Sequence, residues 1–375
     1  MNSNSLFFLC VFLLFSLPLL PALLELWLKK DATPLKVVRE YDGNINYFAQ
    51  TFRHFVEQQF AQFLDTTVVT NMALQYKLQD GSPFQIVGAD GIALFSAAEL
   101  SSRQTQQIII AKSGFKVPDG MFFEKEVYSR QDVIGTNKLS FRAILADGDI
   151  RLGDQCSLIR WVHSQQSIQL GLGAKIYGRI SAEKKINLGA DTRFGRMHAP
   201  VIYFGDGSAS EAQGLATSVA LEMVLENKAA KSKLSMSSKI LDDTANRWLA
   251  KGDYTVSRNT QHQGSLVAQM DLRIEAHCHI VGSLKSSGDL HLDDCCVIEG
   301  AVVAEGTIYI GQSCRIKGPV IGEKTVHIGT GTVIGAAAQL TTITAPIIRI
   351  AYGVIAHGAV WAREMGYVAA PTLKK

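Results

Sequence analysis

Apolar residues recur every 18 positions through the last part of the chain, from Tyr254 to Ala362. Inside each unit, apolar and polar positions alternate over short runs, as they do in β-strands that bury one face. A fixed period with such alternation is typical of a β-solenoid, in which each coil covers the inward side chains of its neighbour. The pattern therefore predicts a mainly β fold, a β-helix whose 18-residue coils each contain three short strands.

The residues expected to point inward form columns of like aliphatic side chains, because neighbouring coils lie about 4.8 Å apart. We interpret these columns as the structural ladder of the fold and as the element on which self-association depends. They comprise Leu272, Ile274, Ile280, Leu290, Leu292, Ile298, Ile308, Ile310, Ile316, Val326, Ile328 and Ile334.

Two further columns hold small residues. Six positions after the start of each coil the residue is Cys or Thr, and we expect it to fill a part of the interior with little room. Ten positions after the start it is glycine, which suits a corner that needs positive φ. The first column is Cys278, Cys296, Cys314 and Thr332, and the second is Gly282, Gly300 and Gly318.

The same template explains an earlier block, in which Val133, Ile150, Ile168 and Ile186 are spaced 17, 18 and 18. Two arrays are therefore expected, over 108–205 and 253–362. In the second, the spacing lengthens to 22 after Val326, which indicates either a looped-out insertion or a wider coil.

Residues 206–252 lose the period and change from an Ala-, Glu-, Leu- and Met-rich stretch to a serine-rich one. This composition favours a helical and polar linker. The pattern leaves open whether the two arrays are separate domains or stack as one rod. Residues 363–375 are expected to be a short tail.

The N-terminal part of the chain has a different character. Residues 6–28 are almost entirely apolar, long enough for a transmembrane helix, and Lys29 and Lys30 follow directly. The positive-inside rule then places the bulk of the chain in the cytoplasm of a single-pass inner-membrane protein. A cleaved signal peptide is the alternative, but no Lys or Arg precedes the apolar run and the small-residue cleavage pattern is poor.

Residues 44–65 carry phenylalanines at steps of three and four, which predicts an amphipathic helix. Its apolar stripe is expected to pack on the core, with membrane contact or capping of the solenoid's end as alternatives. Residues 66–107 mix short apolar runs with polar segments and are expected to form a small irregular or α+β region.

Composition and motifs argue against several function classes. The chain has 375 residues, a formal charge of +3 and no long basic run, so nucleic-acid binding has little support. Six cysteines suit a reducing compartment. No phosphate-binding loop, His-Glu-x-x-His sequence or nucleophile elbow occurs, so no catalytic or cofactor-binding residue is predicted.

A metal site is the one binding chemistry that the ladder suggests. His277, His279 and His291 lie close in sequence to the cysteine column. Zinc ligands, however, are usually brought together tetrahedrally by short loops. Here the cysteines are 18 residues apart on the inward side and His277 and His279 alternate outward, so we expect packed thiols and no metal.

An enzyme of the hexapeptide-repeat type is the alternative function, since those acyltransferases also have 18-residue coils and use a histidine at a subunit boundary. Their aliphatic residue recurs every six positions, whereas here the large aliphatic residues fall at positions 0, 2, 8 and 12 of the coil. The candidate histidines stand in unrelated positions, and we expect each of them to be solvated or packed. They are His163, His198, His327 and His357.

Three segments carry a resemblance to a known family: Gly-Asp-Leu-His-Leu, Val-Ile-Glu-Gly-Ala-Val-Val-Ala-Glu-Gly and Ile-Tyr-Ile-Gly-Gln-Ser-Cys-Arg-Ile-Lys-Gly. They resemble the bactofilins, or polymer-forming cytoskeletal proteins, over about 270–335, and more loosely over 148–195. The resemblance implies a right-handed β-helix in a bacterial protein that assembles end to end, without nucleotide, into membrane-associated filaments. Its implied partners are its own copies, the inner membrane, and cell-wall synthesis or other envelope proteins.

The chain departs from that family in its length, its two arrays and the region 31–107. Physical chemistry supports assembly independently, because a solenoid's end coils expose strand edges and an apolar cross-section. The last coil, Ile348 to Trp361, is still apolar, and either a thin cap formed by the tail or the end coil of a second copy could cover it. We expect a second copy to cover it, with the second array mediating self-association. An adhesin-like β-helix outside the membrane is a third possibility, which requires the opposite topology.

Overall fold

The computed structural model describes residues 45–65, 73–205, 240–244 and 247–370, together with Phe7. Contacts divide the chain into two units, Met1–Asn44 and Ile45–Lys375. The transmembrane helix expected over 6–28 lies outside the described residues apart from Phe7. Within the described part of the chain, no helix is both long and apolar enough to cross a bilayer.

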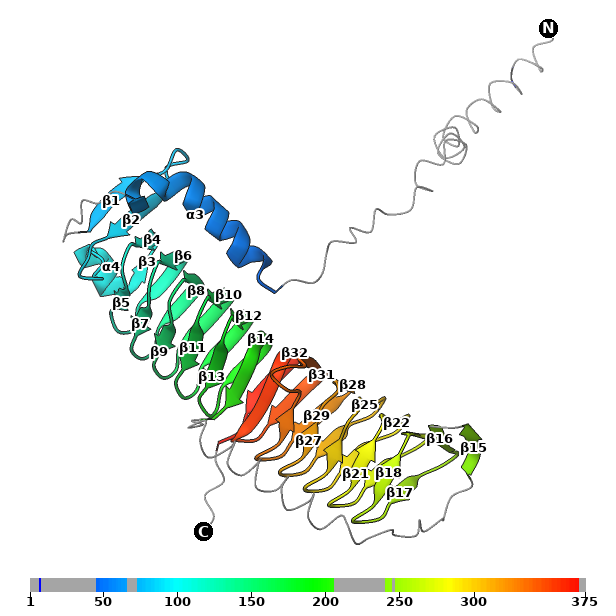
Figure 1. The fold of residues 1–375 in the computed structure, drawn as a ribbon. Coiled ribbons are helices and arrows are strands. Elements are labelled where there is room, and N and C mark those ends of the chain that lie inside the picture. Colours follow the sequence, from blue (N-terminus) through cyan, green and yellow to red (C-terminus); the bar gives the residue numbers. More distant parts are fainter. Residues whose placement is uncertain (1–6, 8–44, 66–72, 206–239, 245–246, 371–375) are drawn as a thin grey trace. The chain divides into compact units, whose positions relative to one another are not determined.

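The second unit is a β-solenoid, as the repeat predicts (Figure 1). Its first part contains β1 (Leu74–Lys77), β2 (Pro83–Val87), β3 (Gln104–Thr105), β4 (Ile108–Ala111), β5 (Phe115–Val117), β6 (Phe122–Ser129), β7 (Val133–Gly135), β8 (Ser140–Ala146), β9 (Ile150–Leu152), β10 (Ser157–Ser164), β11 (Ser167–Leu170), β12 (Lys175–Ala182), β13 (Lys185–Leu188) and β14 (Arg193–Phe204).

The second array follows from β15 onward. Its strands are β15 (Ile240–Thr244), β16 (Arg247–Ala250), β17 (Tyr254–Val256), β18 (Gln261–Gln263), β19 (Ser265–Ala268), β20 (Leu272–Ile274), β21 (His279–Val281), β22 (Leu284–Ser286), β23 (Leu290–Leu292), β24 (Val297–Ile298), β25 (Val302–Ala304), β26 (Ile308–Ile310), β27 (Arg315–Ile316), β28 (Val320–Gly322), β29 (Thr325–Ile328), β30 (Val333–Ile334), β31 (Thr341–Ile350) and β32 (Val354–Val368).

Strand register shows that the sequence period is the coil. Leu272 pairs with Leu290, which pairs with Ile308, and the strands that carry them are parallel. Inward and outward residues alternate along the short strands of the second array, as in β26, whose central residue is exposed between two buried isoleucines. In the first array, pairs of strands merge into longer ones that bend at a bulge, for example between Leu158 and Trp161 in β10.

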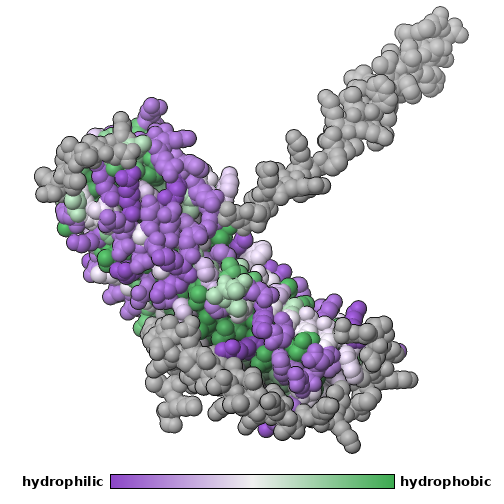
Figure 2. Space-filling model, viewed as in Figure 1, coloured by the Kyte–Doolittle hydropathy of each residue, from purple (hydrophilic) through white to green (hydrophobic). Residues whose placement is uncertain are grey.

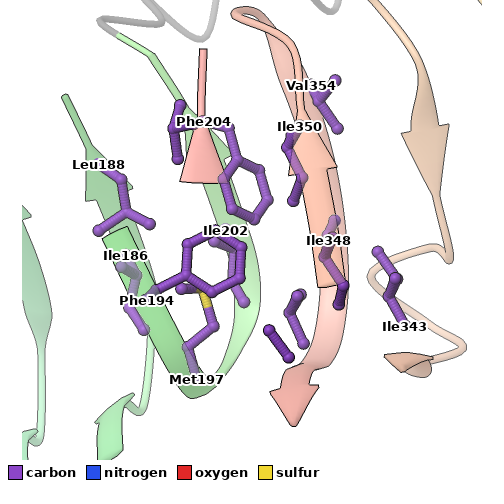
Figure 3. Close-up of a cluster of buried hydrophobic side chains, with 14 of the residues drawn as sticks. Ile186, Leu188, Phe194, Met197, Ile202, Phe204, Ile343, Ile348, Ile350 and Val354 are labelled. Carbon is purple, nitrogen blue, oxygen red and sulfur yellow. The ribbon is translucent and has the colours of Figure 1, made fainter. Parts of the chain in front are cut away.

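The two arrays stack on each other by their C-terminal coils. β14, the last strand of the first array, pairs with β32, the last strand of the second, and the two run antiparallel. The other pairings between stacked coils are parallel, so strand direction reverses at this junction. Figure 3 shows side chains from both sides, Phe194 and Phe204 from the first array and Ile348 and Ile350 from the second, filling one interior.

The lengthened spacing after Val326 is a looped-out insertion. Ile316 pairs with Ile334 at the usual distance, but Ile334 pairs with Ala356, 22 positions on. The extra residues form a tight turn, in which Ala336 and Gln339 make an antiparallel bridge. The coil itself therefore keeps its width.

The expected amphipathic helix is α3 (Tyr47–Asp65). Phe52, Val56, Phe60 and Leu64 form its buried face and pack on the outside of β2, β4, β6, β8 and β10. The stripe covers a side face of the first array, so the expectation that it packs on the core is met and the alternative of an end cap is wrong.

Three expected segments differ from the structure in detail. The described part of 66–107 contains β1, β2, β3 and a short helix, α4 (Ala97–Ser102), and β2 pairs in parallel with β4 of the first array. The segment expected as a linker, 206–252, contributes the hairpin of β15 and β16 to the second array. The expected tail, 363–375, begins inside β32, which continues to Val368 because its last residues pair with β31.

Candidate interaction surfaces

The twelve ladder residues all lie in the interior of the second array. They belong to one continuous apolar core that extends from the start of the first array to the start of the second. Each is at most 4% exposed. As a consequence, the ladder stabilises the coils but presents no surface to a partner, and any contact between molecules has to use residues outside it.

The cysteine column is a ladder of packed thiols, as expected. Cys278, Cys296 and Cys314 are fully buried, and the thiol of each donates a hydrogen bond to a backbone carbonyl 21 residues earlier, at 3.1 to 3.2 Å. Thr332 replaces the thiol with a hydroxyl that makes the same bond to Gly311 at 2.9 Å. Each residue of this column is therefore small and donates a hydrogen bond to the backbone.

Cys278 and Cys296 are poor nucleophiles and poor metal ligands, because both roles need the thiolate. The hydrogen bond with Cys296 and burial both raise the pKa of Cys278. For Cys296, the hydrogen bond with Cys278 lowers the pKa, but the bond with Cys314 and burial outweigh it and raise the value to about 12. The histidines point away from the thiols: His279 contacts Glu299 at 3.3 Å and His291 stacks on Tyr309. Among the described residues, no group of three or more His, Cys, Asp or Glu side chains could hold a metal ion.

The end of the second array is not free. We expected the apolar last coil, Ile348 to Trp361, to be covered by another copy, but β14 of the same chain covers it. Met197 pairs with Val360 and Phe194 with Gly366 across the junction, and all four are buried. The expectation was wrong because side-chain columns do not record which way a neighbouring strand runs.

The opposite end of the second array has open strand edges. Among the described residues, β17 pairs only with β20 and β18 only with β21. The Tyr254 N–H donates to Asp271 and the Val256 carbonyl accepts from Glu275, so both residues face the next coil. Since these groups alternate along a strand, the N–H and C=O of Thr255 point to the open side.

A polar network joins α3 to the first array beside its apolar contact. Arg53 pairs with Asp147 at 2.6 Å, and Asp147 accepts a hydrogen bond from the Tyr128 hydroxyl at 2.9 Å. Burial and the Asp147 carboxylate raise the pKa of Tyr128 to about 12. Asn46, at the start of the helix, donates to Glu183 at 3.1 Å. These polar contacts fix the position of α3 along the array, whereas the apolar contact holds the helix on its surface.

Near the same helix end, His163 is hydrogen-bonded to Ser181 at 2.9 Å and lies 3.8 Å from Glu183. The order Ser–His–Glu is that of a hydrolase triad, but Ser181 is only 2% exposed, so its hydroxyl cannot reach a substrate. Burial lowers the pKa of His163, against the opposing effect of Glu183. The arrangement is therefore a packed polar contact.

The other histidines weighed for acyl transfer also have structural partners. His357 is hydrogen-bonded to the Pro200 carbonyl at 2.8 Å, which links the two arrays. His327 stacks on Tyr309, whose ring also stacks on His291, with centroids 5.0 and 4.6 Å apart. Burial lowers the pKa of His198. The stack was not foreseen, although the outward column of the repeat contains the signal for it.

Two parts of the outer surface near α3 differ in character. The outward side of α3 is polar, with exposed Gln58 and Gln59. Further along the same face, Val303 and Ile321 point outward and are half-buried, and Figure 2 shows apolar surface over the strands next to the junction.

Comparison of the chain with protein-family models, with curated proteins and with solved structures finds no match.

Proposed function

We propose that the protein is a membrane-anchored, non-catalytic, self-assembling β-helical scaffold of bactofilin type, with the bulk of the chain on the cytoplasmic side of a bacterial inner membrane. Its partners are its own copies and envelope proteins such as cell-wall synthesis enzymes. The proposal places the contact between copies at the start of the second array, because the other end of that array is used within the molecule.

The observation that carries the proposal is the open edge of β17 and β18 among the described residues. An unpaired strand edge is a template for another strand, and proteins that stay monomeric usually block it with Lys, Pro or a bulge. β17 has the sequence Tyr-Thr-Val and carries none of these devices. The core beneath it is continuous, so a second copy would extend an already formed stack.

The test is to block this edge and measure assembly of the full-length chain in detergent by sedimentation velocity and negative-stain microscopy. Thr255→Pro removes an N–H that points to the open side and no hydrogen bond within the array. Thr255→Lys keeps this N–H but places a charge at the edge, and Thr255→Ser is the matched control. We expect the Pro and Lys variants to sediment as smaller species and the Ser variant to behave like the parent.

Circular dichroism checks that each variant keeps its β content. Assemblies of unchanged size in folded Thr255→Pro and Thr255→Lys would contradict the proposal, as would a parent chain that is monomeric at every concentration tested.

A further inference from the structure

The junction between the arrays creates a basic row on the outside of the solenoid. Four outward side chains follow one another on adjacent strands: Lys175 on β12, Arg193 on β14, Tyr367 on β32 and Arg349 on β31. Strand spacing places them in a line about 14 Å long. The two arrays contribute two residues each, so the row exists only because their last coils meet.

A second, less polar row runs beside the first. On the same strands, two positions away, stand Tyr177, Met365 and Ile347, and the residues between the two rows are buried. Tyr177 is 68% exposed and Met365 is 43% exposed, both high values for such side chains. We call these two rows together the junction patch.

The positive charge of the patch is only partly offset within the described part of the chain. Lys175, Arg193 and Arg349 form no ion pair with described residues. Asp191, at the edge of the patch, accepts a hydrogen bond from the Tyr367 hydroxyl at 2.6 Å. In the second array the row continues through His327, Tyr309 and His291 to Arg273. The Asp271 and Asp289 carboxylates beside that part of the row accept backbone N–H bonds from the next coil.

The expected anchor points to a partner for the patch. α3 begins beside β12, past the bend that separates this part of the strand from Lys175: Asn46 contacts Glu183, and Arg179 lies over Phe48 at 5.1 Å. Residues 29–44 connect this point to the expected transmembrane segment and can span at most about 55 Å. An anchor of this kind would therefore hold the first array within reach of a bilayer.

We propose that the junction patch binds the anionic lipid headgroups of the membrane that holds the anchor. The inference rests on the membrane-anchored scaffold proposed above. Basic side chains next to exposed tyrosine and methionine suit the boundary between headgroups and acyl chains. An anionic surface attracts Lys and Arg within about a Debye length, and salt weakens the attraction. Bound in this way, the solenoid lies with one chosen face on the membrane.

The test uses the full-length chain reconstituted in vesicles of phosphatidylcholine, with or without phosphatidylglycerol. Tyr177→Cys carries an environment-sensitive fluorophore, in a background with Cys10→Ser and Cys295→Ser. Gln169→Cys, on a different face of the same coil, carries it in the control. We expect a blue shift and quenching by headgroup-labelled lipid at position 177 only, only with phosphatidylglycerol, and loss of both in high salt.

Charge reversal provides the second arm. The triple variant K175E, R193E and R349E should lose the response at position 177, whereas K184E, K185E and K251E, with the same change in net charge, should keep it. A response that ignores lipid charge, or that survives the first triple variant, overturns the inference. An acidic protein would then be the better candidate for the patch.

Flotation separates this inference from the proposed anchor. A chain that floats with pure phosphatidylcholine vesicles has an anchor, whatever the patch does. A chain that does not float with these vesicles has no anchor. In that case the parent chain should still float with vesicles that contain phosphatidylglycerol, in a salt-sensitive way, and the K175E, R193E and R349E variant should not. Absence of that flotation overturns the patch alone.

Discussion

Individual positions of the repeat have physical requirements that the sequence pattern shows only in part. The aliphatic and thiol columns could be assigned from the sequence because burial selects for size and polarity. The glycine column could not. Gly282, Gly300 and Gly318 do not have positive φ, and a Cβ at each would lie 2.2 to 2.5 Å from the backbone of the coil below. Glycine is needed there because stacked corners approach closely.

The left-handed backbone conformation occurs at another place in the coil. It is adopted five positions after the start by His277, Cys295 and Ser313, with φ between 55° and 60°. The column also contains Asn259 and Gly331, residue types that favour positive φ, so the sequence carries a partial signal for this conformation. At His277, Cys295 and Ser313 the turn between two strands imposes it. Positive φ without glycine costs free energy, which the stacked neighbours offset.

His262 interrupts an isoleucine column and gives a prediction at this scale. It pairs with Ile280 at the first coil of the second array, is 5% exposed, and its Nε2 has no hydrogen-bond partner among the described residues. Burial lowers its pKa from 6.5. As the pH falls through 6.5, the unfolded chain therefore gains a proton that the folded chain resists, and stability is lost on acidification.

His262→Ile should raise the free energy of unfolding by about 1 kcal/mol or more at neutral pH, because an unsatisfied buried polar group is removed. It should also reduce the fall in melting temperature between about pH 7.5 and pH 5.5, leaving the contributions of His163, His198 and His327, which have the same sign. Thermal unfolding at the two pH values measures both effects. His277→Gln, at an exposed corner, is the control, and an unchanged pH dependence in His262→Ile would contradict the assignment.

At the scale of elements, periodicity predicted α3 and its buried side, but not the surface on which it packs. Val56, Phe60 and Leu64 repeat every four residues, which is a local property of the helix. The receiving surface is made of outward residues such as Tyr128, Leu145 and Trp161, which belong to three successive coils. In the sequence these residues interrupt the polar outward positions one at a time, so only the stacked structure brings them together.

Phe60 should hold α3 on the array. It is fully buried, and its ring meets Phe84 edge-on at 4.8 Å. Phe60→Ala removes this contact at a typical cost of about 3 kcal/mol or more, and opening of the helix should absorb much of it. Hydrogen exchange should therefore speed up in α3 and leave the strands of the second array unchanged. Gln59→Ala, at the exposed neighbouring residue, should have no effect, and equal protection of α3 in both variants would contradict this role.

At the scale of the whole solenoid, the sequence predicted two arrays and left their relationship open. Both last coils are apolar and both have the same column pattern, so the sequence is compatible with stacking and with separation. The structure shows that they stack, with strand direction reversed between β14 and β32. Which coil meets which depends on the path between the arrays and on backbone pairing, neither of which the side-chain columns encode.

Gly366 and Phe194 make the junction testable. A Cβ at Gly366 would lie 2.0 Å from the Phe194 ring, so Gly366→Ala should force the ring to move. Overpacking of this kind costs about 1–3 kcal/mol. In a Phe194→Ala background the space is available and the added cost should disappear, which gives a coupling energy in denaturant unfolding. Strictly additive effects of the two substitutions would mean that the two coils do not pack as described.

The number of coils in each array can change without affecting the junction between β14 and β32. Each array starts at an outer end and finishes at the junction, with β14 or β32. A whole repeat could therefore be gained or lost between the outer end and the last strand of an array without altering the junction. Excision of residues 290–307, one full turn of the second array, would move its outer end inward by about 4.8 Å and leave every other pairing in place. The length of each array can thus change independently of the other.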